Sequence, residues 1–264
     1  MIVYRRIFGN IDSKIGKYTI ENIFKIPFEW GYFTKDIDEK SVEYGRIKRL
    51  IKPLGLHDSI LGAEFTKQEI FDAEILCFKG AKTFSYPEPQ EPTTFLDNTY
   101  LDCCRECGTY GIQKMDFEIR RAFKPNSLSL GMLHWVFDEL FVGTDISRDF
   151  FLRQLKLRER PLKIYRKDKE AHSIAQLIID ELDHDLDMAE LESTYCMMCN
   201  KTKYIPTITG FFPLPQNRNF DLIKTREFFG SGKSASHRIL LSNDIMQQMI
   251  KLKIAKQHQF VPCN

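Results

Sequence analysis

The sequence has no long apolar run. No window approaches the roughly 20 apolar residues that a membrane-spanning helix requires, and the opening stretch MIVYRRIFGNIDSK has no apolar segment of signal-peptide length. There is also no strong excess of one charge, because 38 Lys and Arg residues stand against 36 Asp and Glu residues. The formal net charge of +2 gives no general reason to expect nucleic acid or an anionic membrane as partner. We therefore expect a soluble, cytoplasmic protein without a membrane partner.

Signatures of catalysis are missing as well. The six histidines include no His-Glu-x-x-His pair, and there is no Gly-x-Ser-x-Gly motif. The stretch Phe229–Ser234 (FGSGKS) resembles a phosphate-binding loop, but Glu227 stands where that motif requires glycine, so we predict an ordinary loop before a strand. Asp138 and Glu139 are adjacent acids at a predicted strand entry, where we expect them to be solvated. We predict that the protein is not an enzyme.

Length and composition are sufficient for a substantial core. The 264 residues, 43% of them hydrophobic and 21 of them Phe, can form one large domain or two ordinary ones. Residues 1–92 predict an N-terminal α+β region with a helix near residues 39–52, a strand near residues 74–78 and a proline-rich connector at residues 86–92. Residues 93–264 form a second predicted region, which can also be continuous with the first. The expected fold class is α+β.

The second region repeats its own pattern at an offset of 99 residues. Each copy predicts a strand, a polar helix start, an amphipathic helix and a closing strand, and Thr144, Ser242 and Asn243 are suitable N-cap residues. The aligned positions are Leu140/Ile239, Asp145/Asp244, Ile146/Ile245, Phe150/Met249, Phe151/Ile250, Leu155/Ile254 and Leu162/Val261. We predict two related strand–helix–strand halves. Chance similarity between two common units is the alternative.

A Cys-x-x-Cys pair precedes each copy. The two pairs are Cys104/Cys107 and Cys196/Cys199, at an offset of 92, so loop length differs by about seven residues between the copies. The residue after each pair is Gly108 or Asn200, and these types enter the left-handed conformation of a metal-binding turn at the least cost. Four thiolates form the closed tetrahedron of a structural Zn²⁺ site. We predict that the four cysteines share one zinc ion, which joins the two halves at paired knuckles.

Other interpretations of the cysteines stay open. The thiols can be reduced and metal-free, or serve thioredoxin-like redox chemistry, which requires the pair to open a helix. Cys103 can replace Cys104 as a ligand, whereas we expect Cys77 and Cys263 to be packing residues. The odd total of seven cysteines is typical of a reducing compartment rather than a secreted disulfide framework.

Charge is segregated along the second region. Residues 169–193 have helically spaced apolar positions, and their other face is acidic from residue 180 to residue 192. The candidate partner-binding residues on it are Asp180, Asp183, Asp185, Asp187 and Glu190. An acidic helix can be a docking surface for a basic partner or only a solvated face. Residues 201–264 carry ten Lys and Arg against three Asp and Glu, and the stretch Lys201–Tyr204 (KTKY) interleaves lysine with an aromatic residue, as in nucleic-acid binding.

The paired motifs, their spacing and the ending Ser242–Asp244 with Phe260–Pro262 resemble the double-CXXCG immunity proteins of bacterial polymorphic toxin systems. The resemblance covers about residues 70–264, and Asn200 departs from the glycine of the motif. It implies a non-enzymatic bacterial cytoplasmic protein that binds and neutralises one cognate toxin. A zinc-ribbon nucleic-acid-binding protein that uses its basic C-terminal region is the main alternative. A zinc-dependent enzyme with an open coordination position is the third class.

Overall fold

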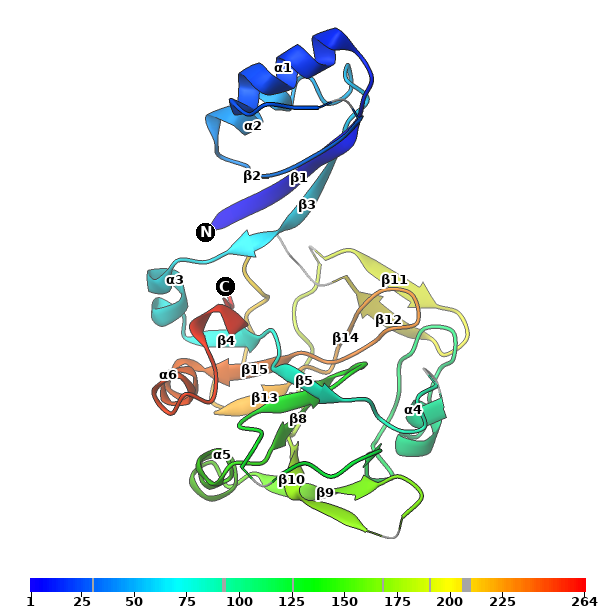
Figure 1. The fold of residues 1–264 in the computed structure, drawn as a ribbon. Coiled ribbons are helices and arrows are strands. Elements are labelled where there is room, and N and C mark those ends of the chain that lie inside the picture. The colour runs from blue at the N-terminus through cyan, green and yellow to red at the C-terminus, as the bar shows by residue number, and fades with distance from the viewer. Residues whose placement is uncertain (30, 92–93, 125, 168, 190, 206–209) are drawn as a thin grey trace. The chain divides into compact units, whose positions relative to one another are not determined.

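The structure is a computed structural model that describes the chain except residues 30, 92–93, 125, 168, 190 and 206–209 (Figure 1). The fold is mixed α+β, as predicted. The chain forms two compact units, Met1–Glu69 with Thr207–Phe211, and Ile70–Pro206 with Phe212–Asn264. Among the described residues, no helix combines the length and the apolar character needed to cross a membrane.

The first unit is built on one antiparallel sheet. Its strand order is β2-β1-β3, and α1 and α2 belong to the same unit. The elements are β1 (Ile2–Ile11), α1 (Lys14–Phe24), β2 (Gly31–Asp38), α2 (Val42–Ile47) and β3 (His57–Glu64). Ser13 and Ser41 begin the two helices, because each side chain accepts a hydrogen bond from a first-turn backbone N–H. Ile7, Ile20 and Ile47 are fully buried and form part of the core.

The boundary between the units falls in α3 (Lys67–Asp72), ahead of the predicted boundary at residue 92. The reason is strand pairing. The predicted strand near residues 74–78 is β4 (Ile75–Phe78), and both β4 and β5 (Lys82–Ser85) pair with strands of the second unit. Pro92, the predicted end of the connector, lies outside the described residues.

The larger sheet of the second unit has the strand order β5-β7-β8-β10-β9-β6. Its remaining strands are β6 (Glu118–Ile119), β7 (Gly131–Leu133), β8 (Val136–Val142), β9 (Arg158–Ile164) and β10 (Glu170–Ile178). Two helices belong to this part of the chain, α4 (Thr94–Thr99) and α5 (Asp145–Arg148), and a π-helical turn (Asp149–Gln154) continues α5. Phe117, Phe141 and Leu162 are fully buried in one core cluster.

Two smaller sheets complete the second unit. One has the order β13-β15-β4-β16 and the other has the order β11-β12-β14. The elements are β11 (Ser193–Cys196), β12 (Lys201–Tyr204), β13 (Leu222–Lys224), β14 (Phe228–Phe229), β15 (Ile239–Ser242), α6 (Asn243–Lys251), a 3-10 turn (Gln257–Gln259) and β16 (Phe260–Pro262). Thr144 and Ser242 are the N-caps of α5 and α6, in agreement with the sequence.

The predicted copies each contain a strand, a helix and a strand, which are β8–α5–β9 and β15–α6–β16 (Figure 1). In both sheets a third strand separates the first strand from the last, β10 in one sheet and β4 in the other. Val142 lies opposite Ala175, and Leu241 lies opposite Leu76, so the paired positions differ by 99 residues on both strands. The separating strands, β10 and β4, are each antiparallel to both of their neighbours.

The uninterrupted alignment to Leu162/Val261 is wrong by two residues at the closing strand. Pro161 lies opposite Ala175, whereas Pro262 lies opposite Leu76, which is an offset of 101. The helices end differently. The first continues into a π-helical turn, whereas a 3-10 turn follows the second, and these connections account for the shift.

The predicted acidic helix is also wrong. Residues 170–178 form β10, and residues 179–192 form irregular backbone wherever they are described. Ile174, Ala175, Gln176 and Leu177 are all buried, because β10 is an interior strand with both faces covered. A strand buried on both faces has no polar alternation, so its apolar run imitates helical spacing.

Asp138 and Glu139 are likewise not solvated. They lie within β8 and are 1% and 4% exposed. Glu139 forms a 2.6 Å ion pair with the buried Lys224, and the carboxylate of Asp138 accepts hydrogen bonds from Tyr110 and from the backbone of His237. The acids therefore belong to an internal polar network, as buried charges require.

Candidate metal centre

The two cysteine pairs meet in space. The Sγ atoms of Cys104, Cys107, Cys196 and Cys199 all lie within 4.8 Å of one another. Cys104 Sγ is 3.8 Å from Cys196 Sγ, and Cys107 Sγ is 3.5 Å from Cys199 Sγ. Thiolates at about 2.3 Å from a tetrahedral zinc ion are themselves about 3.8 Å apart. The sequence prediction that these four residues come together is confirmed, and their geometry and chemistry suit a metal ion.

Each pair sits in the same kind of tight turn. The N–H of Gly108 donates to the carbonyl of Cys104 at 2.8 Å, and the N–H of Asn200 donates to the carbonyl of Cys196 at 2.9 Å. Gly108 has φ of 79° and Asn200 has φ of 56°, so both predictions of a left-handed residue are confirmed. A Cβ at Gly108 would also collide with the carbonyl of Lys233, which makes glycine necessary there.

The sulfurs differ in how readily they lose a proton. Burial raises the pKa of Cys107 to about 11. Burial also acts to raise the pKa of Cys199, but hydrogen bonds from the Thr109 hydroxyl and the Lys201 backbone N–H outweigh it and lower that pKa to about 6. A bound dication favours the thiolate form of every ligand. It would therefore lower the pKa of all four thiols, as hydrogen bonding already does for Cys199.

A buried lysine lies beside the cluster. Lys203 is 3% exposed, and its Nζ donates to the carbonyls of Cys107 at 2.8 Å, Gly232 at 2.6 Å and Ser234 at 3.0 Å. These are neutral acceptors, whereas four thiolates around a dication carry a net charge of −2. The ammonium group of Lys203 would therefore partly balance the charge of a metal-loaded site.

The burial of Lys203 could not be predicted from the sequence. The stretch Lys201–Tyr204 suggested an exposed strand, and that expectation is wrong for Lys203. Lys203 is internal, and the Nζ of the half-buried Lys201 donates to the carbonyl of Tyr110 at 2.9 Å. A period-two pattern places both lysines on one face of β12, but it does not say which face is covered.

The FGSGKS stretch has a structural task. It connects β14 to β15, as the sequence predicted, and two of its carbonyls, those of Gly232 and Ser234, hold Lys203. A phosphate-binding loop presents backbone N–H groups and opens a helix. This loop presents carbonyls and leads to a strand, so it contributes to the surroundings of the metal centre instead.

The other cysteines stand apart from the group. Cys77 is buried in β4, and Cys263 is buried directly after β16, as expected of packing residues. The Sγ of Cys103 lies 3.2 Å from the carbonyl of Leu96 and is not part of the four-cysteine cluster. The group of four neighbouring cysteines is therefore the one predicted, with Cys104 rather than Cys103.

The predicted partner-binding acids form a separate, exposed feature. The side chains of Asp180, Asp183 and Asp185 are 82%, 76% and 74% exposed, and Asp187 is exposed as well. Glu190 lies outside the described residues. Asp180 pairs with Arg158 at 3.2 Å, and Asp185 pairs with Arg226 at 3.5 Å. Such exposed pairs contribute little to stability, so these acids form an exposed charged surface rather than a structural network.

Comparisons with protein-family models, with curated proteins and with solved structures find no match.

Proposed function

We propose that the four-cysteine cluster binds one Zn²⁺ in a structural role. The convergence of two Cys-x-x-Cys turns from distant parts of the chain supports this proposal, and so does the internal cation of Lys203. Among the described residues, no histidine or carboxylate joins the cluster. Four protein ligands leave no open coordination position, and closed sites of this kind stabilise rather than catalyse.

We further propose that residues 70–264 are a duplicated unit whose leading strands have exchanged places. β4 and β10 are 99 residues apart and occupy matching central positions in their sheets. If β4 leads the first copy and β10 leads the second, each leading strand pairs with the strand–helix–strand of the other copy. Exchange of identical elements is a known route to association between copies of one unit.

The offset of the cysteine pairs supports the same duplication. Gly131 of β7 lies opposite Phe141, and Ile223 of β13 lies opposite Leu240, so β7 and β13 are related by the cysteine offset of 92 rather than 99. The extra seven residues therefore belong to the connection between β13 and β15, which is longer than the turn between β7 and β8. The zinc ion would then hold one turn from each copy.

At the level of function we propose an immunity protein that binds and neutralises a cognate bacterial toxin in the cytoplasm. The observation that carries the proposal is the meeting of the two Cys-x-x-Cys turns at one site, which gives the resemblance to double-CXXCG immunity proteins a physical basis. A closed metal site and an exposed acidic segment suit a protein that binds another macromolecule. Opposite charge would speed the encounter with a basic toxin surface.

The test is co-expression with the toxin domain encoded beside this chain. We expect cells that express that domain to survive only when the chain is present, and the two proteins to purify as one complex. Persistent toxicity without a complex would overturn the proposal. Nucleic acid that co-purifies instead, with binding that weakens steeply as salt rises, would favour a zinc-ribbon nucleic-acid-binding protein.

A further inference from the structure

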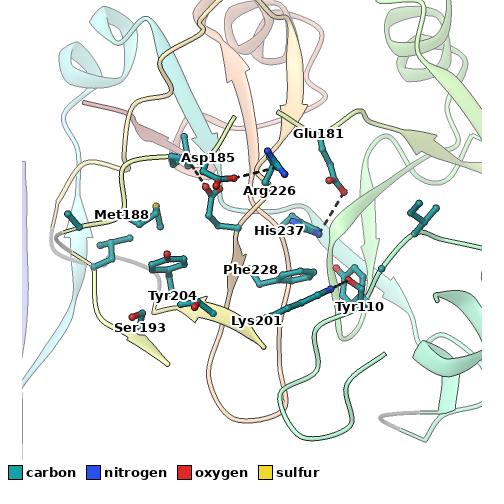
Figure 2. Close-up of a pocket in the computed structure, with 17 residues that line it drawn as sticks. Tyr110, Glu181, Asp185, Met188, Ser193, Lys201, Tyr204, Arg226, Phe228 and His237 are labelled. Carbon is teal, nitrogen blue, oxygen red and sulfur yellow. Dashed lines mark hydrogen bonds and ion pairs between the residues drawn. The ribbon is translucent and has the colours of Figure 1, made fainter. Parts of the chain in front are cut away.

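A cleft of about 790 Å³ opens in the second unit (Figure 2). Its lining comes from the chain after the first cysteine pair, from the acidic segment, from β12 and from the chain on either side of β14. A volume of this size lies within the range of ligand-binding sites. None of the four clustered cysteines lines this cleft, so it is a separate feature from the candidate metal centre.

Two side chains of the lining have buried polar atoms without a partner. His237 is 6% exposed, and its Nδ1 has no hydrogen-bond partner among the described residues. The same holds for Oε2 of Glu227, whose Oε1 accepts the N–H of Leu186. Such unpaired atoms are rare in folded proteins because burial deprives them of water. Both atoms are covered from solvent, so a ligand that brings hydrogen-bond donors into the cleft would satisfy them once the two side chains turn toward it.

The cations of the cleft already have partners. Lys201 donates to the carbonyl of Tyr110, and Arg226 pairs with Asp185 at 3.5 Å. Among the residues that the structure describes, the ion-pair contact of the Glu181 carboxylate is with the His237 ring at 4.0 Å, toward which Figure 2 shows it directed. Three carboxylates of the lining, Glu181, Asp185 and Glu227, stand against the two cations, so its formal net charge is negative.

Aromatic rings complete the lining. Tyr110, Tyr204 and Phe228 all border the cleft, and the Phe228 ring packs on His237 with ring centroids 4.1 Å apart. Ring faces attract organic cations more strongly than anions of the same size, and Lys201 Nζ already lies 5.2 Å from the centroid of the Phe228 ring. Carboxylates together with ring faces define a site for a guanidinium or ammonium group.

We propose that this cleft receives a basic side chain, preferably arginine, of a partner polypeptide. Glu181 and Glu227 supply the negative charge, and His237 supplies Nδ1 as a further acceptor in the tautomer that carries its proton on Nε2. A planar guanidinium has several N–H groups in a fixed fork and can pair with separate acceptors at once, which an ammonium does less well. The inference rests on the proposed function, because the cognate toxin would be the source of that side chain.

The first experiment uses small probes on the full zinc-loaded chain. Calorimetric titration with N-acetyl-L-arginine methylamide is expected to show binding stronger than that of the lysine analogue, and no binding of the glutamate analogue. Glu181→Gln and Glu227→Gln should each weaken arginine-analogue binding by about fivefold or more, because each removes a charge-assisted partner. The matched control Asp187→Asn changes an exposed carboxylate outside the cleft lining and should leave binding unchanged. Equal binding of the glutamate analogue, or unchanged binding by both glutamine variants, would overturn the inference.

The second experiment separates this inference from the proposed function. If the arginine analogue binds as expected but no neighbouring toxin domain does, the cleft assignment stands and the immunity role fails. If the toxin binds Glu181→Gln and Glu227→Gln as tightly as it binds the unchanged chain, the immunity role stands and the cleft assignment fails. Thermal unfolding of both variants, expected near that of the unchanged chain or above it, shows that lost binding is not lost folding.

Discussion

The Nζ of Lys203 donates a 2.8 Å hydrogen bond to the carbonyl of Cys107, inside the protein and next to the thiol cluster. Isolated ammonium groups are costly to bury, and this one is surrounded by carbonyls rather than by a carboxylate. Attraction to an anionic thiolate site next to it would offset this cost of burial. We propose that the lysine and a metal-loaded cluster would form one electrostatic unit.

Lys203→Met should therefore damage both stability and metal binding. Three carbonyls lose their donor and the loaded site loses its cation, so we expect a loss of about 3 kcal/mol in unfolding free energy and about 10- to 100-fold in zinc affinity. Urea unfolding and competition with a chromogenic chelator measure the two effects. Lys251→Met removes an exposed lysine of α6 and should change neither. Unchanged zinc affinity in Lys203→Met would contradict the electrostatic role.

Replacement of ligand cysteines should remove the metal. We expect one zinc ion per chain by elemental analysis, and less than one in Cys104→Ser and Cys199→Ser. Cys103→Ser is the matched control, because its sulfur lies outside the cluster, and it should keep its zinc. Structural zinc contributes on the order of 10 kcal/mol in isolated finger peptides, so chelation should lower the thermal midpoint clearly here. A chain that purifies folded and zinc-free would refute the metal assignment.

Glu227 should make stability depend on pH in a defined direction. Burial raises its pKa in the folded protein. A carboxyl whose pKa is higher in the folded state does not change the free energy of unfolding below the unfolded-state pKa of about 4.3. It lowers the free energy of unfolding as the pH rises above that value. Glu227→Gln should therefore stabilise the protein at pH 7 and have almost no effect near pH 3. Thermal midpoints across that interval check it, and a benefit that is largest in acid would contradict the burial argument.

The exchanged strands predict that neither copy folds alone. A fragment of residues 70–166 lacks β10, the strand between its own β8 and β9, and a fragment of residues 167–264 lacks β4, the strand between its own β15 and β16. We expect each fragment to show little β structure by circular dichroism and the equimolar mixture with zinc to recover it. Independent folding of either fragment would argue against the exchange.

Local chemistry in the sequence was enough to predict some of these features. The left-handed turns at Gly108 and Asn200, the caps at Thr144 and Ser242, and the ligand set itself follow from residue types at fixed spacing, because they depend on the nearest few bonds. The strand–helix–strand order of both copies also follows from short-range periodicity. For the same reason an interior strand such as β10 was mistaken for a helix, since its buried run has no alternation to reveal it.

The tertiary structure alone decided which distant groups meet and which polar groups are covered. Asp138, Glu139 and Lys203 look like surface residues in the sequence, and each is buried against a partner 85 to 99 residues away in the chain, namely His237, Lys224 and Cys107. The pairing of β4 with β15 and the cleft beside His237 likewise depend on contacts between segments that are distant in the sequence. Side-chain chemistry is written in the sequence, whereas solvation and charge pairing depend on neighbours that only the folded chain brings into contact.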